Sequence, residues 1–130
     1  MHIGAVAEAT GISAKTIRYY ESIGLTPRPE RRENGYRDYG ANDVATLRFV
    51  QRARGLGFPL EEVRALLALW RDQDRASADV KQLALDHIGT IEDRIAELET
   101  MKRTLQDLTR RCHGDDRPDC PILEDLAKLK

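Results

Sequence analysis

Residues 12–25 read ISAKTIRYYESIGL, and this stretch carries the strongest indication of the fold. Ser13 is a good N-cap and Gly24 commonly ends helices, so the residues between them are expected to form a short helix. Ile12 and Ile17 would pack inward. Residues three and four apart share one face of a helix. The side chains predicted on the opposite, outer face are Lys15, Arg18 and Tyr19.

The residues before this stretch predict a first helix, which would complete a helix–turn–helix. Ile3, Val6 and Ala7 recur at helical spacing, and Gly11 then suits a helix end. A helix–turn–helix whose second helix is basic is the arrangement that enters a DNA major groove. A small helical hairpin with a solvated outer face has the same pattern, and this segment alone does not separate the two interpretations.

The following stretch, RRENGYRDY at residues 31–39, predicts a β-hairpin. Asn34-Gly35 supports the positive φ angles of a type I′ turn. A ribbon of arginines and tyrosines behind a helix–turn–helix is typical of a wing, whose side chains reach phosphates or a minor groove. A solvated hairpin with aromatic cross-strand packing is the alternative. The residues that we expect on the DNA backbone are Arg31, Tyr36, Arg37 and, further along the chain, Arg54.

Two more helices are expected between residues 43 and 70. Asp43 can cap the first, which would end near Gly55. Pro59 fits the first turn of the second. The apolar residues of both helices recur at helical spacing and predict core positions. They are Val44, Leu47 and Val50 in the first helix, and Val63, Leu66, Leu67 and Trp70 in the second.

The longest periodic segment, residues 78–111, predicts a dimerisation helix. Its apolar residues alternate four and three apart, which is the pattern of a coiled coil. A single amphipathic helix of this length cannot fold back on a core of matching length within 130 residues. Pairing with the same helix of a second subunit is therefore expected. The residues of this pattern are Ala84, Ile88, Ile91, Ile95, Leu98 and Leu105.

The two cysteines of the chain lie together in the next segment, CHGDDRPDCP at residues 112–121. The thiolates of Cys112 and Cys120 can face one ion from opposite sides, and soft ligands of this kind suit Cu(I), Ag(I) or Au(I). Zinc prefers four ligands, usually Cys and His, and the chain has no third thiol. A divalent-metal site with His113 and Asp119, a redox-active disulfide and a pair of spare thiols remain as alternatives.

Composition and charge exclude several classes of protein. No apolar run is long enough to cross a bilayer and no secretory signal is present, so we expect a cytoplasmic protein without a membrane partner. The net charge of −1 does not by itself indicate a nucleic-acid binder. No nucleophile–base constellation or phosphate loop is visible, which argues against an enzyme. A structural coiled-coil adaptor is the second class of function that the pattern allows.

The order of these segments resembles the MerR family of transcriptional regulators over essentially the whole chain. Three motifs carry the resemblance: IRYYE at residues 17–21 followed by Gly24-Leu25, GYRDY at residues 35–39, and LGFPLEEV at residues 56–63. The resemblance implies a mainly α fold. Its expected parts are a winged helix–turn–helix DNA-binding domain over residues 1–75, an antiparallel coiled-coil dimerisation helix over 76–111, and a metal-binding loop with a short C-terminal helix over 112–130.

Within that family, residues 112–123 resemble the copper-efflux regulators of the CueR type. Ser77 matches as well, because it stands where that subgroup has serine and where relatives that sense divalent metals have cysteine. The resemblance implies a homodimer that binds double-stranded promoter DNA and holds one monovalent ion per subunit. It also implies that the dimer activates metal-efflux genes by untwisting a promoter whose spacer is too long for RNA polymerase.

Overall fold

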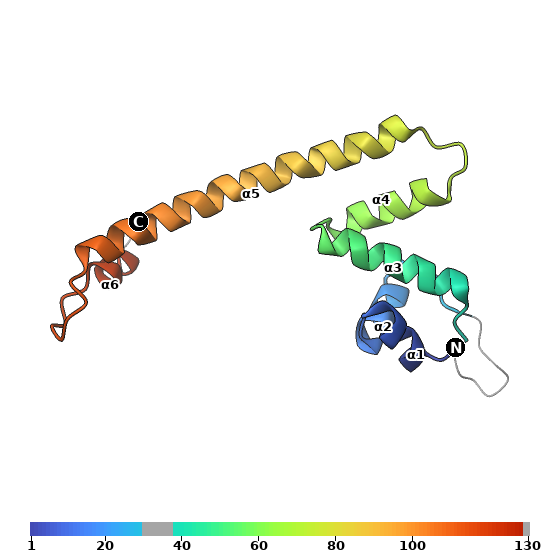
Figure 1. Ribbon diagram of the computed structural model, residues 1–130, viewed down its shortest axis with the longest axis horizontal. Helices are drawn as coiled ribbons and strands as arrows, with labels where there is room; N and C mark the ends of the chain where they lie inside the picture. Colours follow the sequence, from blue (N-terminus) through green and yellow to red (C-terminus); the bar gives the residue numbers. More distant parts are fainter. Residues whose placement is uncertain (30–37, 129–130) are drawn as a thin grey trace. The chain divides into compact units, whose positions relative to one another are not determined.

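The computed structural model describes residues 1–29 and 38–128, and within these ranges the chain forms six α-helices and no β-strand (Figure 1). The chain divides into two compact units, Met1–Leu83 and Ala84–Lys130. The mainly α fold is confirmed. The predicted hairpin turn, with Arg31, Tyr36 and Arg37, lies outside the described residues. The helices are α1 (Ile3–Thr10), α2 (Ala14–Ser22), α3 (Ala41–Gly55), α4 (Leu60–Arg71), α5 (Ser77–Arg111) and α6 (Pro121–Leu126).

The ends of α1 and α2 follow from local sequence signals. Gly11 has a φ of 73°, a left-handed conformation that favours glycine, and its N–H donates to the Ala7 carbonyl at 2.9 Å. The Ser13 hydroxyl accepts a hydrogen bond from the Thr16 N–H at 3.1 Å and caps α2. Both helices of the predicted helix–turn–helix are confirmed, with boundaries within one residue of the expected ones.

The core of the first unit is formed by α1 to α4 and the segments that join them. Ile17 and Val50 are fully buried, and Ile12 is 4% exposed, as their spacing predicts. Tyr39 and Phe58 add aromatic rings to the same cluster from the connecting segments. The buried apolar cluster consists of Val6, Ile12, Ile17, Tyr20, Leu25, Tyr39, Val44, Leu47, Val50, Ala53, Phe58, Val63 and Leu67.

Trp70 is the one predicted core residue of α4 that the structure places largely outside the core. Val63 and Leu67 are buried, but Trp70 is 43% exposed and stacks on Phe49 with ring centroids 4.5 Å apart. Trp70 lies in the last turn of α4, which ends at Arg71. The helical spacing of apolar residues extends into this last turn, but the core beside the helix ends before it. The indole therefore covers the edge of the core.

The start of α3 also differs from the expected one. The helix begins at Ala41, with Gly40 as its N-cap, and Asp43 lies inside the first turn. The Asp43 carboxylate accepts a hydrogen bond from the Gly40 N–H at 2.8 Å. Asp43 therefore still satisfies a free donor at the start of the helix, but from the third helical position and not from the cap itself.

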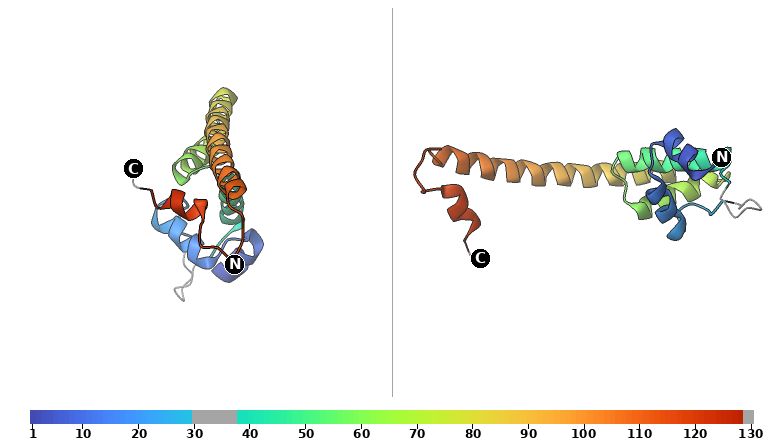
Figure 2. Two further views of the ribbon diagram at one scale, coloured as in Figure 1. Left: turned by 90° about the vertical axis from the view of Figure 1, so that its left-hand side faces the viewer. Right: turned by 90° about the horizontal axis from the view of Figure 1, so that it is seen from below.

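The 35 residues of α5 form one uninterrupted helix, after which the chain turns back into α6 (Figures 1 and 2). Pro121 occupies the first position of α6, as predicted. Among the described residues, no helix has both the length and the apolar character that a membrane span needs. The domain boundaries expected at residues 75/76 and 111/112 remain predictions.

Candidate DNA-binding and metal-binding sites

The outer face of α2 carries the three side chains predicted to meet DNA. Lys15, Arg18 and Tyr19 are exposed, with Tyr19 at 51%, while Ile17 and Tyr20 on the other face are buried in the core. The burial of one face fixes the rotation of the helix about its axis. The two cations and the phenol are consequently presented together on a single accessible surface.

A side chain from α4 holds the end of α2 in place. Arg64 donates from Nη1 to the Gly24 carbonyl and from Nη2 to the Ile23 carbonyl, both at 2.9 Å. These carbonyls follow the last turn of α2, where backbone acceptors lack partners within the helix. The guanidinium fork satisfies two of them at once and links the helix to a segment 40 residues later in the chain. No motif or spacing in the sequence indicates this role of Arg64.

A buried hydrogen bond joins α2 to Tyr39, the last residue of the predicted wing. The Tyr39 hydroxyl donates to the Glu21 carboxylate at 2.7 Å, and both residues are buried, at 4% and 5% exposure. Glu21 and Tyr39 lie inside the IRYYE and GYRDY motifs, but their spacing of 18 residues gives no indication that they meet. The bond ties the far end of the predicted hairpin to the helix that carries Lys15 and Arg18.

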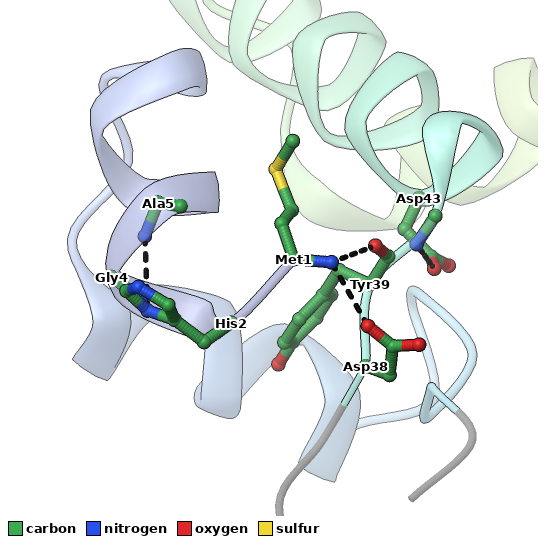
Figure 3. A network of polar contacts seen from close by, with 8 residues as sticks. Met1, His2, Gly4, Ala5, Asp38, Tyr39 and Asp43 are labelled. Carbon is green, nitrogen blue, oxygen red and sulfur yellow. Dashed lines mark hydrogen bonds and ion pairs between the residues drawn. The ribbon is translucent and has the colours of Figure 1, made fainter. Parts of the chain in front are cut away.

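The N-terminal residues form hydrogen bonds with Asp38 and Tyr39 (Figure 3). The Tyr39 N–H donates to the Met1 carbonyl at 2.8 Å, and the Met1 nitrogen donates to the Tyr39 carbonyl at 2.8 Å and to the Asp38 carboxylate at 2.9 Å. His2 then caps α1, because its Nδ1 accepts from the N–H groups of Gly4 and Ala5. The last two residues of the predicted wing, Asp38 and Tyr39, are therefore attached to both helices of the helix–turn–helix.

Arg54, predicted to contact the DNA backbone, lies in the last turn of α3. It also forms a hydrogen bond within the protein. Its Nη1 donates to the Phe58 carbonyl at 2.9 Å, across the turn between α3 and α4. A guanidinium has five N–H donors, so this bond leaves others for a phosphate. The predicted wing contacts of Arg31, Tyr36 and Arg37 lie outside the described residues.

The two cysteines stand at the two ends of one loop in the second unit. Cys112 directly follows α5, and its N–H donates to the Leu108 carbonyl at 3.2 Å. Cys120 is the N-cap of α6. Both side chains are partly buried and both are free thiols. The loop thus starts and ends at a helix terminus, with one sulfur at each end.

The middle of this loop is ordered by contacts between Asp115 and Arg117. The Asp115 carboxylate accepts from the Arg117 Nε at 2.9 Å and from its backbone N–H at 3.0 Å, and it forms an ion pair with Nη2 at 2.7 Å. The side-chain hydrogen bond from Arg117, followed by the backbone one, lowers the pKa of Asp115 below its usual range. Gly114, just before the pair, has a φ of 68°, a conformation that favours glycine.

The donor set of this loop fits a soft ion that accepts two ligands. Two thiolates are suitable ligands for such an ion, and the loop supplies both. In the described ranges 1–29 and 38–128, no three or more His, Cys, Asp or Glu residues are grouped so that they could hold a metal. His113 and Asp119, the further ligands considered for a divalent ion, are exposed. Ser77, the residue expected to influence selectivity, is the exposed first residue of α5.

Two family models match the chain. The model described as MerR HTH family regulatory protein matches residues 1–69, and the model described as MerR, DNA binding, matches residues 44–108. The first covers the helix–turn–helix and most of α4. The second begins inside α3 and ends four residues before Cys112.

Proteins of known name and structure are similar along nearly the full length. The chain is 58% identical over 127 residues to the heavy metal-dependent transcription regulator 2 of Rhizobium meliloti (strain 1021), covering 98% of this chain and 86% of that one. It is 45% identical to the transcriptional regulator CueR of Escherichia coli O6:H1, covering 98% and 94%. The crystal structure of PbrR691 from Ralstonia metallidurans CH34, in complex with lead(II), superposes with a TM-score of 0.83 at 34% identity, covering 98% and 99%.

Proposed function

Because the chain belongs to the MerR family of transcriptional regulators, whose members bind DNA and are not enzymes, we propose that it activates metal-efflux genes in response to Cu(I), Ag(I) or Au(I). The regulator acts as a homodimer on promoter DNA, with one ion per subunit and RNA polymerase engaged at the same promoter. The observation that carries the choice of ion is the pair of partly buried free thiols at the two ends of the loop after α5.

The DNA-binding part of the proposal is supported by the exposed face of α2. Lys15, Arg18 and Tyr19 would lie in the major groove, where a recognition helix meets base edges. Arg31, Tyr36, Arg37 and Arg54 would contact the backbone phosphates. Such contacts release counterions, and operator binding is therefore expected to weaken steeply with salt concentration.

The homodimer is supported by an apolar stripe on α5. Seven large apolar side chains along this helix are between 41% and 53% exposed in the single chain. An apolar surface of this extent on one helix marks an interaction site, and pairing with a second copy would bury it. The stripe consists of Leu85, Ile88, Ile91, Ile95, Leu98, Met101 and Leu105.

The metal-binding part rests on Cys112 and Cys120. When bound between the two sulfurs, a monovalent ion would link the end of α5 to the start of α6. Ser77 of the partner subunit would lie over the site and supply no strong ligand, since a hydroxyl binds soft metals poorly. A divalent ion would need a further ligand at such a position. This difference adds to the preference for the copper group that the two thiols indicate.

The test is to replace each cysteine separately by serine. Cys112→Ser and Cys120→Ser should each abolish induction by copper or silver, because one thiolate cannot link α5 to α6. Operator binding should remain, because both residues lie outside the unit that contains α2. His113→Ala, a change in the same loop, serves as the control and should keep induction.

Spectroscopy provides a second, independent criterion. X-ray absorption of the Cu(I)-loaded protein should show two short metal–sulfur paths and no nitrogen shell. A four-coordinate zinc signal with mixed sulfur and nitrogen ligands would identify the divalent alternative instead. Induction that survives in either serine variant would contradict the assignment of the site and leave the DNA-binding function standing.

A redox sensor is another alternative for the same two thiols. In that case an oxidant would induce transcription without metal, through a Cys112–Cys120 disulfide. Measuring transcription with diamide in the presence of a metal chelator separates the two functions. Metal sensing predicts no induction under these conditions.

A further inference from the structure

The Asp115–Arg117 pair occupies the centre of the loop that carries the two cysteines. Asp115 lies three residues after Cys112, and Arg117 lies three residues before Cys120. The two arms of the loop, residues 112–114 and 118–120, are therefore equal in length. The pair is therefore at the midpoint of the stretch between the two cysteines.

The pair fixes this turn through both side chain and backbone. One carboxylate oxygen of Asp115 accepts from the Arg117 backbone N–H at 3.0 Å, and the other accepts from Nε at 2.9 Å and pairs with Nη2 at 2.7 Å. The backbone bond defines a local turn in which an aspartate accepts from the residue two positions later. The charged bonds add an attraction that does not depend on the rest of the fold.

The residues on either side of the pair restrict the turn further. Gly114 has a φ of 68°, and Pro118 has a φ fixed by its ring. Cys112 is attached to α5 through its N–H bond to the Leu108 carbonyl, and Cys120 is the N-cap of α6. Residues with restricted backbone torsions thus flank the turn on both sides. Each cysteine is also restrained in position, because it is adjacent to the end of a helix.

We propose that Asp115 and Arg117 are positioning residues that hold the turn between Cys112 and Cys120, so that the two sulfurs engage one ion together. This inference rests on the proposed metal-sensing function. The physical reason is entropic: two ligands on a flexible loop lose conformational freedom when they converge, and a turn already formed at the centre of the loop reduces that loss. Neither residue touches the ion.

The size of the effect follows from the exposure of the pair. The Asp115 and Arg117 side chains are 43% and 65% exposed, so water and salt weaken the ion pair. Loss of an exposed pair of this kind corresponds to about a two- to five-fold change in an equilibrium constant. Asp115→Ala should have a larger effect than Arg117→Ala, because only the former also removes the acceptor of the backbone bond.

The experiment measures how readily the two thiols meet, without metal or DNA. The full-length protein is equilibrated with glutathione and its disulfide. One glutathione disulfide oxidises Cys112 and Cys120 to an intramolecular disulfide and yields two glutathione molecules. The equilibrium constant of this exchange has the units of a concentration. It gives the effective concentration of one cysteine thiol in the neighbourhood of the other. Cu(I) affinity is measured in parallel by competition with a chromogenic Cu(I) chelator.

Four variants make the test specific. Arg117→Ala and Asp115→Asn should each lower the effective concentration about two- to five-fold, since asparagine keeps the backbone acceptor and loses the charge. Asp115→Ala should lower it further. The exchange of the two residues, Asp115→Arg with Arg117→Asp, should recover part of the loss by restoring opposite charges.

The matched control is Asp116→Ala, which removes a carboxylate between the two positions and should match the wild type. Cu(I) affinity should fall by the same factors as the effective concentration. An unchanged effective concentration in Asp115→Ala and Arg117→Ala, or an equal decrease in Asp116→Ala, would overturn the inference. If the effective concentration falls as expected but the wild type binds no Cu(I), the positioning role stands and the proposed ion is wrong.

Discussion

At the scale of single residues, Arg18 is the side chain on which the DNA-binding interpretation can be tested most directly. It is exposed on the outer face of α2, one turn from Lys15. Arg18→Ala should weaken operator binding by about 1–3 kcal/mol, the range for a side chain that reads a base or an ordered phosphate. A fluorescence-anisotropy titration with operator DNA measures the change.

The control for Arg18 is Arg103→Ala, which removes the same charge from an exposed position on α5. This control should leave the operator affinity unchanged apart from a small effect of net charge. An Arg18→Ala variant with wild-type affinity would remove Arg18 from the DNA interface.

Tyr39 and Glu21 form a second test at the same scale. Tyr39→Phe removes the donor from a buried carboxylate and should lower the free energy of unfolding by about 1–3 kcal/mol. Urea denaturation followed by circular dichroism gives the value. Tyr19→Phe, which removes a phenol hydroxyl from a 51% exposed ring, is the matched control and should have little effect. Equal stability of the two variants would mean that the buried bond contributes nothing.

At the scale of elements, the apolar stripe of α5 allows the proposed dimer to be tested. The double change Ile91→Asp with Ile95→Asp places two charges where pairing would remove them from water, which is strongly unfavourable. The protein should then sediment as a monomer and lose operator affinity, because each half-site would hold a single helix–turn–helix. Sedimentation velocity and an operator titration measure the two effects.

The matched control for the stripe is Thr90→Asp with Ala96→Asp, which adds the same charges to exposed positions of α5 outside the stripe. This variant should remain dimeric. If the Ile91 and Ile95 variant also remains dimeric, the stripe is covered in some way other than by pairing with a second α5.

Local signals made most helices predictable from the sequence. Gly11 and Ser13 determine the turn between α1 and α2 through their own torsions and hydrogen bonds, and the spacing of Val44, Leu47 and Val50 identifies the buried face of α3. The exposure of Trp70 was not predictable, because a periodic pattern does not indicate where the neighbouring core ends.

The contacts that position the candidate sites were harder to predict. The Arg64 bonds span 40 and 41 residues and the Tyr39–Glu21 bond spans 18, so only the folded chain brings these groups together. The two cysteines were identified by their type and by their common loop. Asp115 and Arg117 are only two residues apart, so their contact is local. An aspartate followed two residues later by a backbone N–H donor is a known turn pattern, and the pair was therefore predictable from the sequence.

At the scale of the whole molecule, the family resemblance is confirmed by both matching models and by relatives aligned over 98% of the chain. Metal is expected to act on a regulator that is already bound to its operator. An ion changes the balance between two conformations only through different affinities for them. To shift the population almost completely from one conformation to the other, the ion must bind the second conformation about 10⁴-fold more tightly than the first.

If metal acts on the operator-bound regulator, Ag(I) should change the rate of transcription more than it changes the fraction of operator DNA that is occupied. Footprinting should give similar operator affinities with and without Ag(I), while permanganate reactivity of the promoter and transcription both rise with Ag(I). The Cys112→Ser variant is the control and should show neither increase. A large gain in operator affinity on adding Ag(I), with unchanged DNA reactivity, would indicate simple recruitment instead.

The Arg64 bonds matter for anyone who would reprogram the specificity of this regulator. Transplanting residues 12–25 into another scaffold moves the helix that presents Lys15 and Arg18, but leaves behind the guanidinium that binds the two carbonyls directly after this helix. A chimaera built by cutting the sequence at convenient linkers would inherit the side chains without their orientation. The transferable module is therefore discontinuous, and Arg64 of α4 has to be transplanted together with α2.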